Sequence, residues 1–109
     1  MAEFLTELNM KQREKVARAI DLLKAYGSLL RFPEADTIKG KKYDGLMELR
    51  VNFSSDIFRI FYYFASENKA VLLHGIAKKQ NRTPIKELDI ALQRMNDHMW
   101  RTKDGMGRI

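Results

Sequence analysis

Two arginines, Arg50 and Arg59, are the residues whose type and spacing best suit chemistry on a phosphate. Each lies in a segment where apolar and polar residues alternate, which is the pattern of a half-buried β-strand. If the two segments pair as a hairpin that buries both apolar sets on one face, Arg50 and Arg59 come to lie close to directly opposite each other. Two guanidinium groups in that position repel, and a phosphate bound between them would neutralise both.

The first alternating segment covers residues 46–53 and the second covers residues 57–64, with a turn between them. The predicted register leaves one face with these residues: Glu48, Arg50, Asn52, Ile57, Arg59, Phe61 and Tyr63. Two interpretations of this face stay open. It is a phosphate clamp in which Phe61 or Tyr63 stacks on a base, or it is a ladder of ion pairs on a solvated sheet, in which Glu48 neutralises one arginine.

The third predicted strand covers residues 70–77, and a basic segment lies at its end. Lys78 and Lys79 end that strand, and one of them must share the face of the arginines because side chains alternate along a strand. Gln80, Asn81 and Arg82 extend the polar edge up to the next helix, whose first N–H groups attract phosphate. These positions are therefore candidates for binding a nucleic acid.

Helical periodicity frames the strands on both sides. Apolar residues recur every three to four positions over residues 10–26, between Asn9 as N-cap and Gly27 at the C-terminal end. A second helix is predicted after Thr83-Pro84, while residues 28–44 form a connection and residues 3–8 add a short helical turn. The order helix, strand, strand, strand, helix predicts an α+β fold, in which a small antiparallel sheet is packed on one face by the N-terminal helix and the C-terminal helix.

Length and composition narrow the class of protein. The 109 residues fit a single domain, which we place at residues 1–101 with a polar tail at 102–109. There is no cysteine, no apolar run near the roughly 20 residues needed to span a membrane, and no signal-peptide pattern at the start, so we expect a cytoplasmic protein with no membrane partner. The net charge of +6 favours an anionic partner such as nucleic acid or an acidic protein.

Other kinds of site have little support in the sequence. His74 and His98 lie far apart without the spacing of metal ligands, so no metal site is predicted. There is no Ser-His-Asp signature, phosphate-cradling glycine loop or dinucleotide fingerprint, and no cofactor is expected. His74 lies inside an apolar strand and is expected to be packed rather than catalytic.

A set of short motifs resembles the RelE/ParE toxin superfamily, and within it the phage-derived HigB-like branch. The motifs are Glu3-Phe4-Leu5, Ile20-Asp21-Leu22-Leu23-Lys24 with Gly27, Gly45-Leu46-Met47-Glu48-Leu49-Arg50, Phe58-Arg59-Ile60-Phe61-Tyr62, Leu72-Leu73-His74-Gly75-Ile76-Ala77-Lys78-Lys79 and Thr83-Pro84. The pattern closes with Ala91, Arg94 and Asp97 in the last helix, and the match covers about residues 3–101.

The resemblance implies a RelE-like fold and a metal-independent endoribonuclease that cleaves mRNA on the ribosome by attack of the 2′-hydroxyl on the neighbouring phosphorus. By motif, Arg59, Lys79 and Arg50 are the implied catalytic residues, with Lys78 as an alternative to Lys79. The RNA-binding candidates are Lys78, Gln80, Arg82 and Tyr63. Relatives often use a Tyr near the C-terminus for proton transfer, but this chain has none after Tyr63, and Glu48 stands where RelE itself has Lys. The general acid and base are therefore left open.

The resemblance also implies partners. A toxin of this type is paired with a cognate antitoxin, often one with a helix-turn-helix domain, and its targets are mRNA and the ribosome. Because the toxin is basic, we expect an acidic antitoxin surface that covers at least part of the arginine face. Two alternatives stay open within the same superfamily: a ParE-like inhibitor of DNA gyrase, and a non-catalytic module that binds only its antitoxin.

Overall fold

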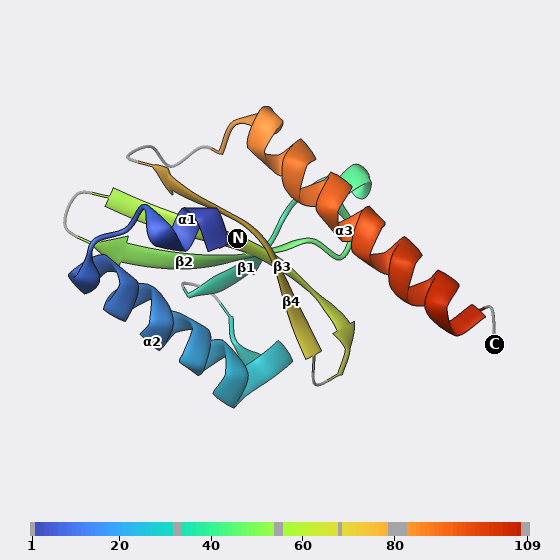
Figure 1. Ribbon diagram of the computed structural model, residues 1–109, viewed down its shortest axis with the longest axis horizontal. Helices are drawn as coiled ribbons and strands as arrows, with labels where there is room; N and C mark the ends of the chain where they lie inside the picture. Colours follow the sequence, from blue (N-terminus) through green and yellow to red (C-terminus); the bar gives the residue numbers. More distant parts are fainter. Residues whose placement is uncertain (1, 32–33, 54–55, 68, 79–82, 108–109) are drawn as a thin grey trace.

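The computed structural model describes residues 2–31, 34–53, 56–67, 69–78 and 83–107 of the chain. Along these residues three α-helices, two short 3₁₀ helices and four strands follow one another (Figure 1). In chain order they are α1 (Ala2–Thr6), α2 (Met10–Tyr26), η1 (Gly27–Leu29), β1 (Ala35–Thr37), η2 (Lys41–Tyr43), β2 (Met47–Phe53), β3 (Asp56–Ser66), β4 (Lys69–Lys78) and α3 (Ile85–Gly107). In Figure 1 the strands run between α2 and α3.

The strands form one antiparallel sheet in the order β1-β2-β3-β4, which confirms the predicted α+β class. The strand β1 was not predicted. It has three residues, of which only Ala35 is buried, so the sequence of this segment shows no alternation for pattern analysis to detect. β1 pairs with β2 from Ala35 opposite Leu49 to Thr37 opposite Met47, and thus gives the hairpin a short outer neighbour.

The register of the central hairpin is the one predicted from burial. Leu49 lies opposite Ile60 and Val51 lies opposite Phe58, and Arg50 lies directly opposite Arg59. Slipping this pairing by one residue would turn the buried set outward, and this is why the apolar alternation specifies it.

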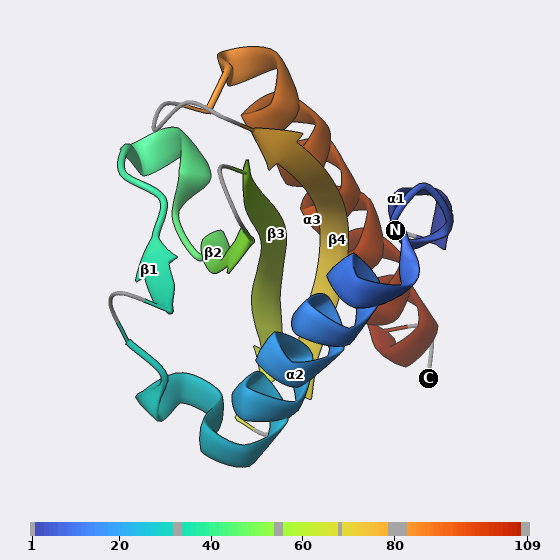
Figure 2. The same cartoon turned by 90° about the vertical axis from the view of Figure 1, so that its left-hand side faces the viewer.

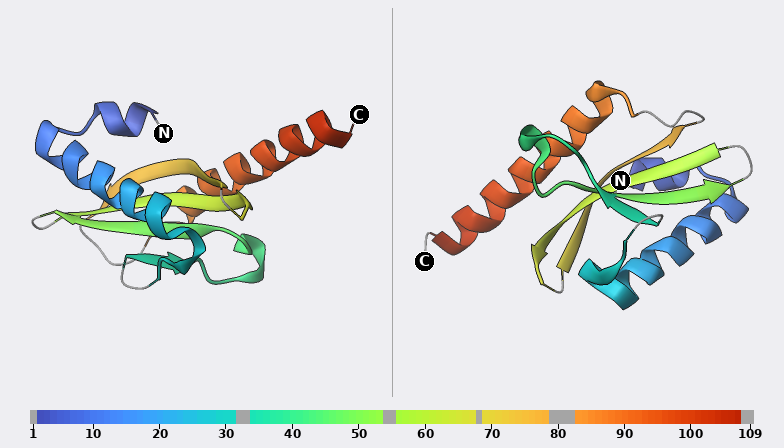
Figure 3. Two further views of the ribbon diagram at one scale, coloured as in Figure 1. Left: turned by 90° about the horizontal axis from the view of Figure 1, so that it is seen from below. Right: turned by 180° about the vertical axis from the view of Figure 1, so that it is seen from behind.

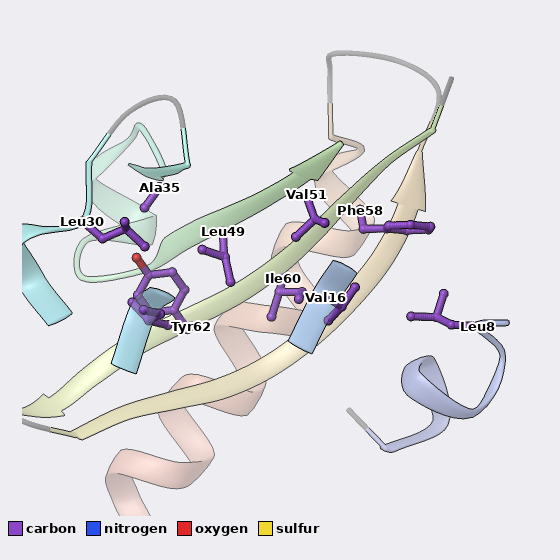
Figure 4. Close-up of a cluster of buried hydrophobic side chains, with 10 residues drawn as sticks. Leu8, Val16, Leu30, Ala35, Leu49, Val51, Phe58, Ile60 and Tyr62 are labelled. Carbon is purple, nitrogen blue, oxygen red and sulfur yellow. The ribbon is translucent and has the colours of Figure 1, made fainter. Parts of the chain in front are cut away.

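One face of the sheet packs against α2. Asn9 caps this helix: its side chain accepts a hydrogen bond from the Gln12 N–H, and the Gln12 side chain accepts one from the Asn9 N–H. The helix then buries Val16 and Leu23 in the same cluster as the apolar side chains of β2 and β3. Figure 4 shows Val16 beside Ile60 of β3. The buried cluster on this side consists of Leu8, Val16, Leu23, Leu30, Ala35, Leu49, Val51, Phe58, Ile60 and Tyr62.

The last helix packs on the other face, and this corrects the expectation that both helices share one face. A second buried cluster joins Ala91 and Met95 of α3 to Phe61 and Tyr63 of β3. These two aromatic residues point away from α2, because they alternate with Ile60 and Tyr62. The apolar stripe of α3 and the aromatic residues therefore bury each other, so the face that was predicted to be open is partly covered.

The C-terminal part of α3 extends beyond the sheet, as both views in Figure 3 show. The helix continues to Gly107, so residues 102–107 of the predicted polar tail are helical. None of the helices formed by the described residues is long and apolar enough to cross a membrane.

Candidate functional site

The two cross-strand arginines meet on the carboxylate of Glu48. Arg59 Nη1 donates to Glu48 Oε1 at 2.7 Å, and Arg50 Nε donates to Glu48 Oε2 at 2.8 Å. Arg50 Nη2 also lies 3.5 Å from Asp36 Oδ2 on β1. β2 supplies Glu48 and Arg50 two residues apart, so both project from the same side of the strand. One carboxylate thus binds both of the guanidinium groups whose repulsion the sequence predicted.

The members of this cluster differ in their access to solvent. The side chains of Arg59 and Glu48 are only 6% and 4% exposed, whereas that of Arg50 is 29% exposed. The prediction that both arginines project from one face is confirmed by the register, but that face is not open at Arg59. Burial of two charges is tolerated here because each has an opposite charge at hydrogen-bond distance.

The described contacts agree with the second interpretation of this face, a ladder of ion pairs. Glu48 was expected to neutralise one arginine, but it contacts both. Arg50, the more exposed arginine, can therefore present a fixed positive charge to an anion. The buried charge of Arg59 lies on the other side of the Glu48 carboxylate, on its second oxygen. Such fixed donors stabilise negative charge because they need no reorganisation when the charge develops.

A second polar cluster, which the sequence analysis missed, joins β4 to α3. His74 Nε2 lies 2.7 Å from Glu87 Oε1, and Arg94 Nη1 lies 3.0 Å from the Leu73 carbonyl oxygen and 3.3 Å from His74 Nδ1. Since a guanidinium only donates and a carboxylate only accepts, these contacts have His74 Nδ1 accepting from Arg94 and the Nε2–H donating to Glu87. The only signal in the sequence is that Glu87 and Arg94 are two helical turns apart, on one side of α3.

His74 is packed, as predicted, but it also makes these polar contacts. Its ring stacks on Phe61 with the centroids 6.2 Å apart and the planes 20° apart. Together with Glu87 and Arg94, it lines a cavity of about 630 Å³, to which Phe4 of α1 also contributes. Figure 2 shows α1 and α3 near the outer strand β4, where this cavity lies.

Three further contacts fix α3 to the rest of the fold. The Tyr43 hydroxyl donates to Asp89 Oδ1 at 2.8 Å, and Lys42 Nζ lies 3.0 Å from the same oxygen. Hydrogen bonds from Lys42 and Tyr43 lower the pKa of Asp89 below its usual value. Tyr63 forms a hydrogen bond with His98 Nδ1. Sequence reasoning assigned no role to Tyr43 or Asp89, because they are far apart in the chain.

The remaining predicted site residues are placed only in part. Tyr63 is 6% exposed under α3, and this burial raises its pKa. Lys78 is the last residue of β4, and its Cα pairs with that of Ile57. Lys79, Gln80 and Arg82 lie outside the described residues. Among the residues that the structure does describe, no group of three His, Cys, Asp or Glu side chains is placed to hold a metal ion.

The comparisons with known proteins identify the family. A family model described as phage-derived Gp49-like protein matches residues 3–96. The chain belongs to this family. Gp49-like proteins are a RelE-like, toxin-like family whose members are common in toxin–antitoxin systems. Neither the curated proteins nor the solved structures contain a significant match.

Proposed function

We propose that this Gp49-like protein is the toxin of a type II toxin–antitoxin pair, of the HigB-like kind, and that it cleaves mRNA on the ribosome in the cytoplasm. The observation that carries the proposal is the cross-strand pair of Arg50 and Arg59, fixed by Glu48 on the sheet of a RelE-like, toxin-like chain. The net charge of +6 supports an anionic target.

The proposed reaction needs groups that stabilise the negative charge which develops on the phosphate, and no cofactor takes part in it. The 2′-hydroxyl oxygen of the RNA attacks phosphorus and loses its proton. The bond from phosphorus to the 5′-oxygen breaks, and that oxygen takes up a proton, which leaves a cyclic phosphate and a 5′-hydroxyl. In our proposal Arg50 contacts the phosphate, and Arg59 adds its positive charge from behind. Lys79, or alternatively Lys78, donates the proton or adds positive charge.

Binding of the RNA is proposed to extend along the basic segment that begins at the end of β4, through Lys78, Gln80 and Arg82. Tyr63 was a further candidate, but its ring is buried against α3 and its hydroxyl is bonded to His98. We therefore assign the RNA contacts to the basic segment and to Arg50. Such phosphate contacts make the affinity fall steeply with added salt, because bound phosphates release counterions.

The test is cleavage of cellular mRNA after induction of the toxin, mapped by primer extension. We expect Arg50→Ala to reduce cleavage by about 10²-fold, the typical effect of removing one positioned donor. Arg18→Ala is the matched control, since Arg18 is an exposed residue of α2 and its loss changes the charge equally. Unchanged cleavage in Arg50→Ala would contradict the proposed site. DNA breaks without RNA cleavage would instead indicate the ParE-like inhibition of gyrase.

A second candidate function is favoured by one observation. Glu48 and Asp36 already neutralise much of the positive charge of the arginine pair. That is what a non-catalytic module which only binds its antitoxin would show. In either case we propose a cognate antitoxin, of the helix-turn-helix kind, with an acidic surface that meets the arginine face. A chain that binds the antitoxin but leaves all mRNA intact on induction would be this module.

A further inference from the structure

Glu48 is the buried centre of the arginine cluster, and the proposed reaction gives it no role. The residue is 3% exposed, and its two oxygens are divided between two strands. Oε1 accepts from Arg59 of β3, and Oε2 accepts from Arg50 of its own strand β2. A carboxylate that shares its oxygens in this way sets the separation and orientation of the two guanidinium groups in addition to neutralising them.

The two arginines are equivalent in register but not in surroundings. They lie directly opposite each other on the two inner strands of the sheet, yet the Arg59 side chain on β3 is 6% exposed, whereas the Arg50 side chain on β2 is 29% exposed. Removing a guanidinium from water costs several kcal/mol unless a counter-charge is fixed beside it. Glu48 supplies that counter-charge, and at the same time it holds Arg50 by Nε.

The second carboxylate near Arg50 is less tightly placed. Asp36 Oδ2 lies 3.5 Å from Arg50 Nη2, and the Asp36 side chain is 38% exposed. An exposed pair at this distance contributes little to stability. A phosphate that approaches Arg50 therefore competes with Asp36, while the short and buried contacts of Glu48 stay in place.

We infer that Glu48 is the positioning residue of this site: it anchors Arg59 as a fixed buried charge and holds Arg50 as the arginine that contacts the phosphate. The inference deepens the proposed function, because it divides the roles of two arginines that the family resemblance treats alike. It places the contact with RNA on Arg50 and leaves Arg59 as the buried charge beside it.

The first test uses the full wild-type chain and does not depend on cleavage. The Nε–H signals of Arg50 and Arg59 are followed by NMR while a single-stranded DNA oligonucleotide, which lacks the attacking 2′-hydroxyl, is added at low salt. We expect the Arg50 signal to move with the oligonucleotide and the Arg59 signal to move much less. A shift at Arg59 as large as that at Arg50, or no shift at Arg50 at saturation, would overturn the inference. Binding with these shifts but without RNA cleavage would leave the inference standing while the proposed function fails.

The second test compares Glu48→Gln with Glu14→Gln, an exposed position on α2 with the same change of charge. A glutamine has one acceptor oxygen and an amide that only donates, so it cannot hold both arginines. If RNA is cleaved, we expect kcat of Glu48→Gln to fall by about 10- to 100-fold while KM changes less than about threefold, because misplaced charge affects the transition state more than binding. Glu14→Gln should change neither constant.

Folding is checked by urea denaturation, so that loss of structure is not taken for loss of position. If Glu48→Gln is unfolded, Glu48→Asp replaces it: the carboxylate is kept but is one methylene too short to reach both arginines, and the same fall in kcat is expected. A folded Glu48 variant with wild-type kcat, and an Arg50 Nε–H signal at its wild-type position, would refute the positioning role. If neither variant folds, the wild-type titration decides.

Discussion

The two faces of the sheet are each covered by a helix, but they are built from different chemistry. Under α2 the buried side chains are aliphatic or aromatic. On the opposite face, where α3 packs on Phe61 and Tyr63, the sheet also buries Glu48 and Arg59, and His74 forms a hydrogen bond with Glu87 of the helix. Apolar burial stabilises the fold by about 25 cal/mol per Å², whereas buried ion pairs contribute little net stability. Both faces bury an apolar cluster, and the second face also holds the charged cluster of the candidate site.

The comparison also explains why one hairpin serves both purposes. Side chains alternate along β3, so Ile60 and Tyr62 point to α2 while Arg59 and Phe61 point to the other side. The register that the apolar residues specify is the same register that brings Arg59 opposite Arg50. The geometry of the charged cluster is thus a consequence of how the apolar core pairs.

The largest effect is expected from a cavity on the apolar face. Leu49 is 1% exposed, and Leu49→Ala should lower the free energy of unfolding by about 2–5 kcal/mol, since a buried leucine loses its contacts and leaves a void. Leu29 is 74% exposed, and the same substitution there should change it by less than about 0.5 kcal/mol. Urea denaturation of both variants measures the difference. Equal effects at the two positions would mean that the α2 face is not the main core.

The apolar face was the part that the sequence could predict. The alternation in β2 and β3 predicted that their apolar sets share one face and that Arg50 lies opposite Arg59, because only one register buries both sets. The strand β1 escaped detection because three residues cannot show a period. The position of α3 was predicted wrongly because Phe61 and Tyr63 were taken for exposed aromatics, although two large rings on one face also indicate a covering element.

A smaller effect is expected where α1 meets the same apolar face. A Cβ added at Gly75 would lie 2.4 Å from Phe4 Cδ2, which is far inside contact distance. Gly75→Ala should therefore displace the Phe4 ring and lower stability by about 1–3 kcal/mol, as overpacking does. The double variant with Phe4→Ala tests the cause. Its loss should be smaller than the sum of the two single losses, and strict additivity would show that the two residues do not interact.

The candidate site was less predictable than the core, for reasons that concern particular residues. Glu48 was expected to pair with one arginine, and its sharing between two depends on side-chain geometry that the sequence does not encode locally. The contact of His74 with Glu87 joins residues on different elements, and it forms only because α3 crosses β4. Lys79 remains a prediction, because it lies outside the described residues.

The smallest effect is a pH-dependent change in the free energy of unfolding at Tyr62, which lies on the opposite face of the sheet from its neighbour Tyr63. Burial in the apolar cluster raises the pKa of Tyr62 to about 12, whereas the Tyr63 hydroxyl on the other face has His98 as a hydrogen-bond partner. Because the Tyr62 pKa is higher in the folded chain than the ordinary 10, the unfolded chain loses its proton first. The associated stability is complete below pH 10 and is lost as the pH rises towards 12.

For a two-unit shift this loss amounts to about 1.4 kcal/mol at pH 11, where the unfolded chain is mostly ionised at this residue and the folded chain is not. Tyr62→Phe removes the titrating hydroxyl and should remove this part of the decline. The two proteins are compared by urea denaturation from pH 8 to pH 11, and the difference between them cancels the other tyrosines and the lysines, which titrate in both. The stability of Tyr62→Phe relative to wild type should therefore rise by about 1.4 kcal/mol over that range. A constant difference would mean that the Tyr62 hydroxyl reaches water in the folded chain. The sheet face under α2 would then be less completely apolar than its buried cluster indicates.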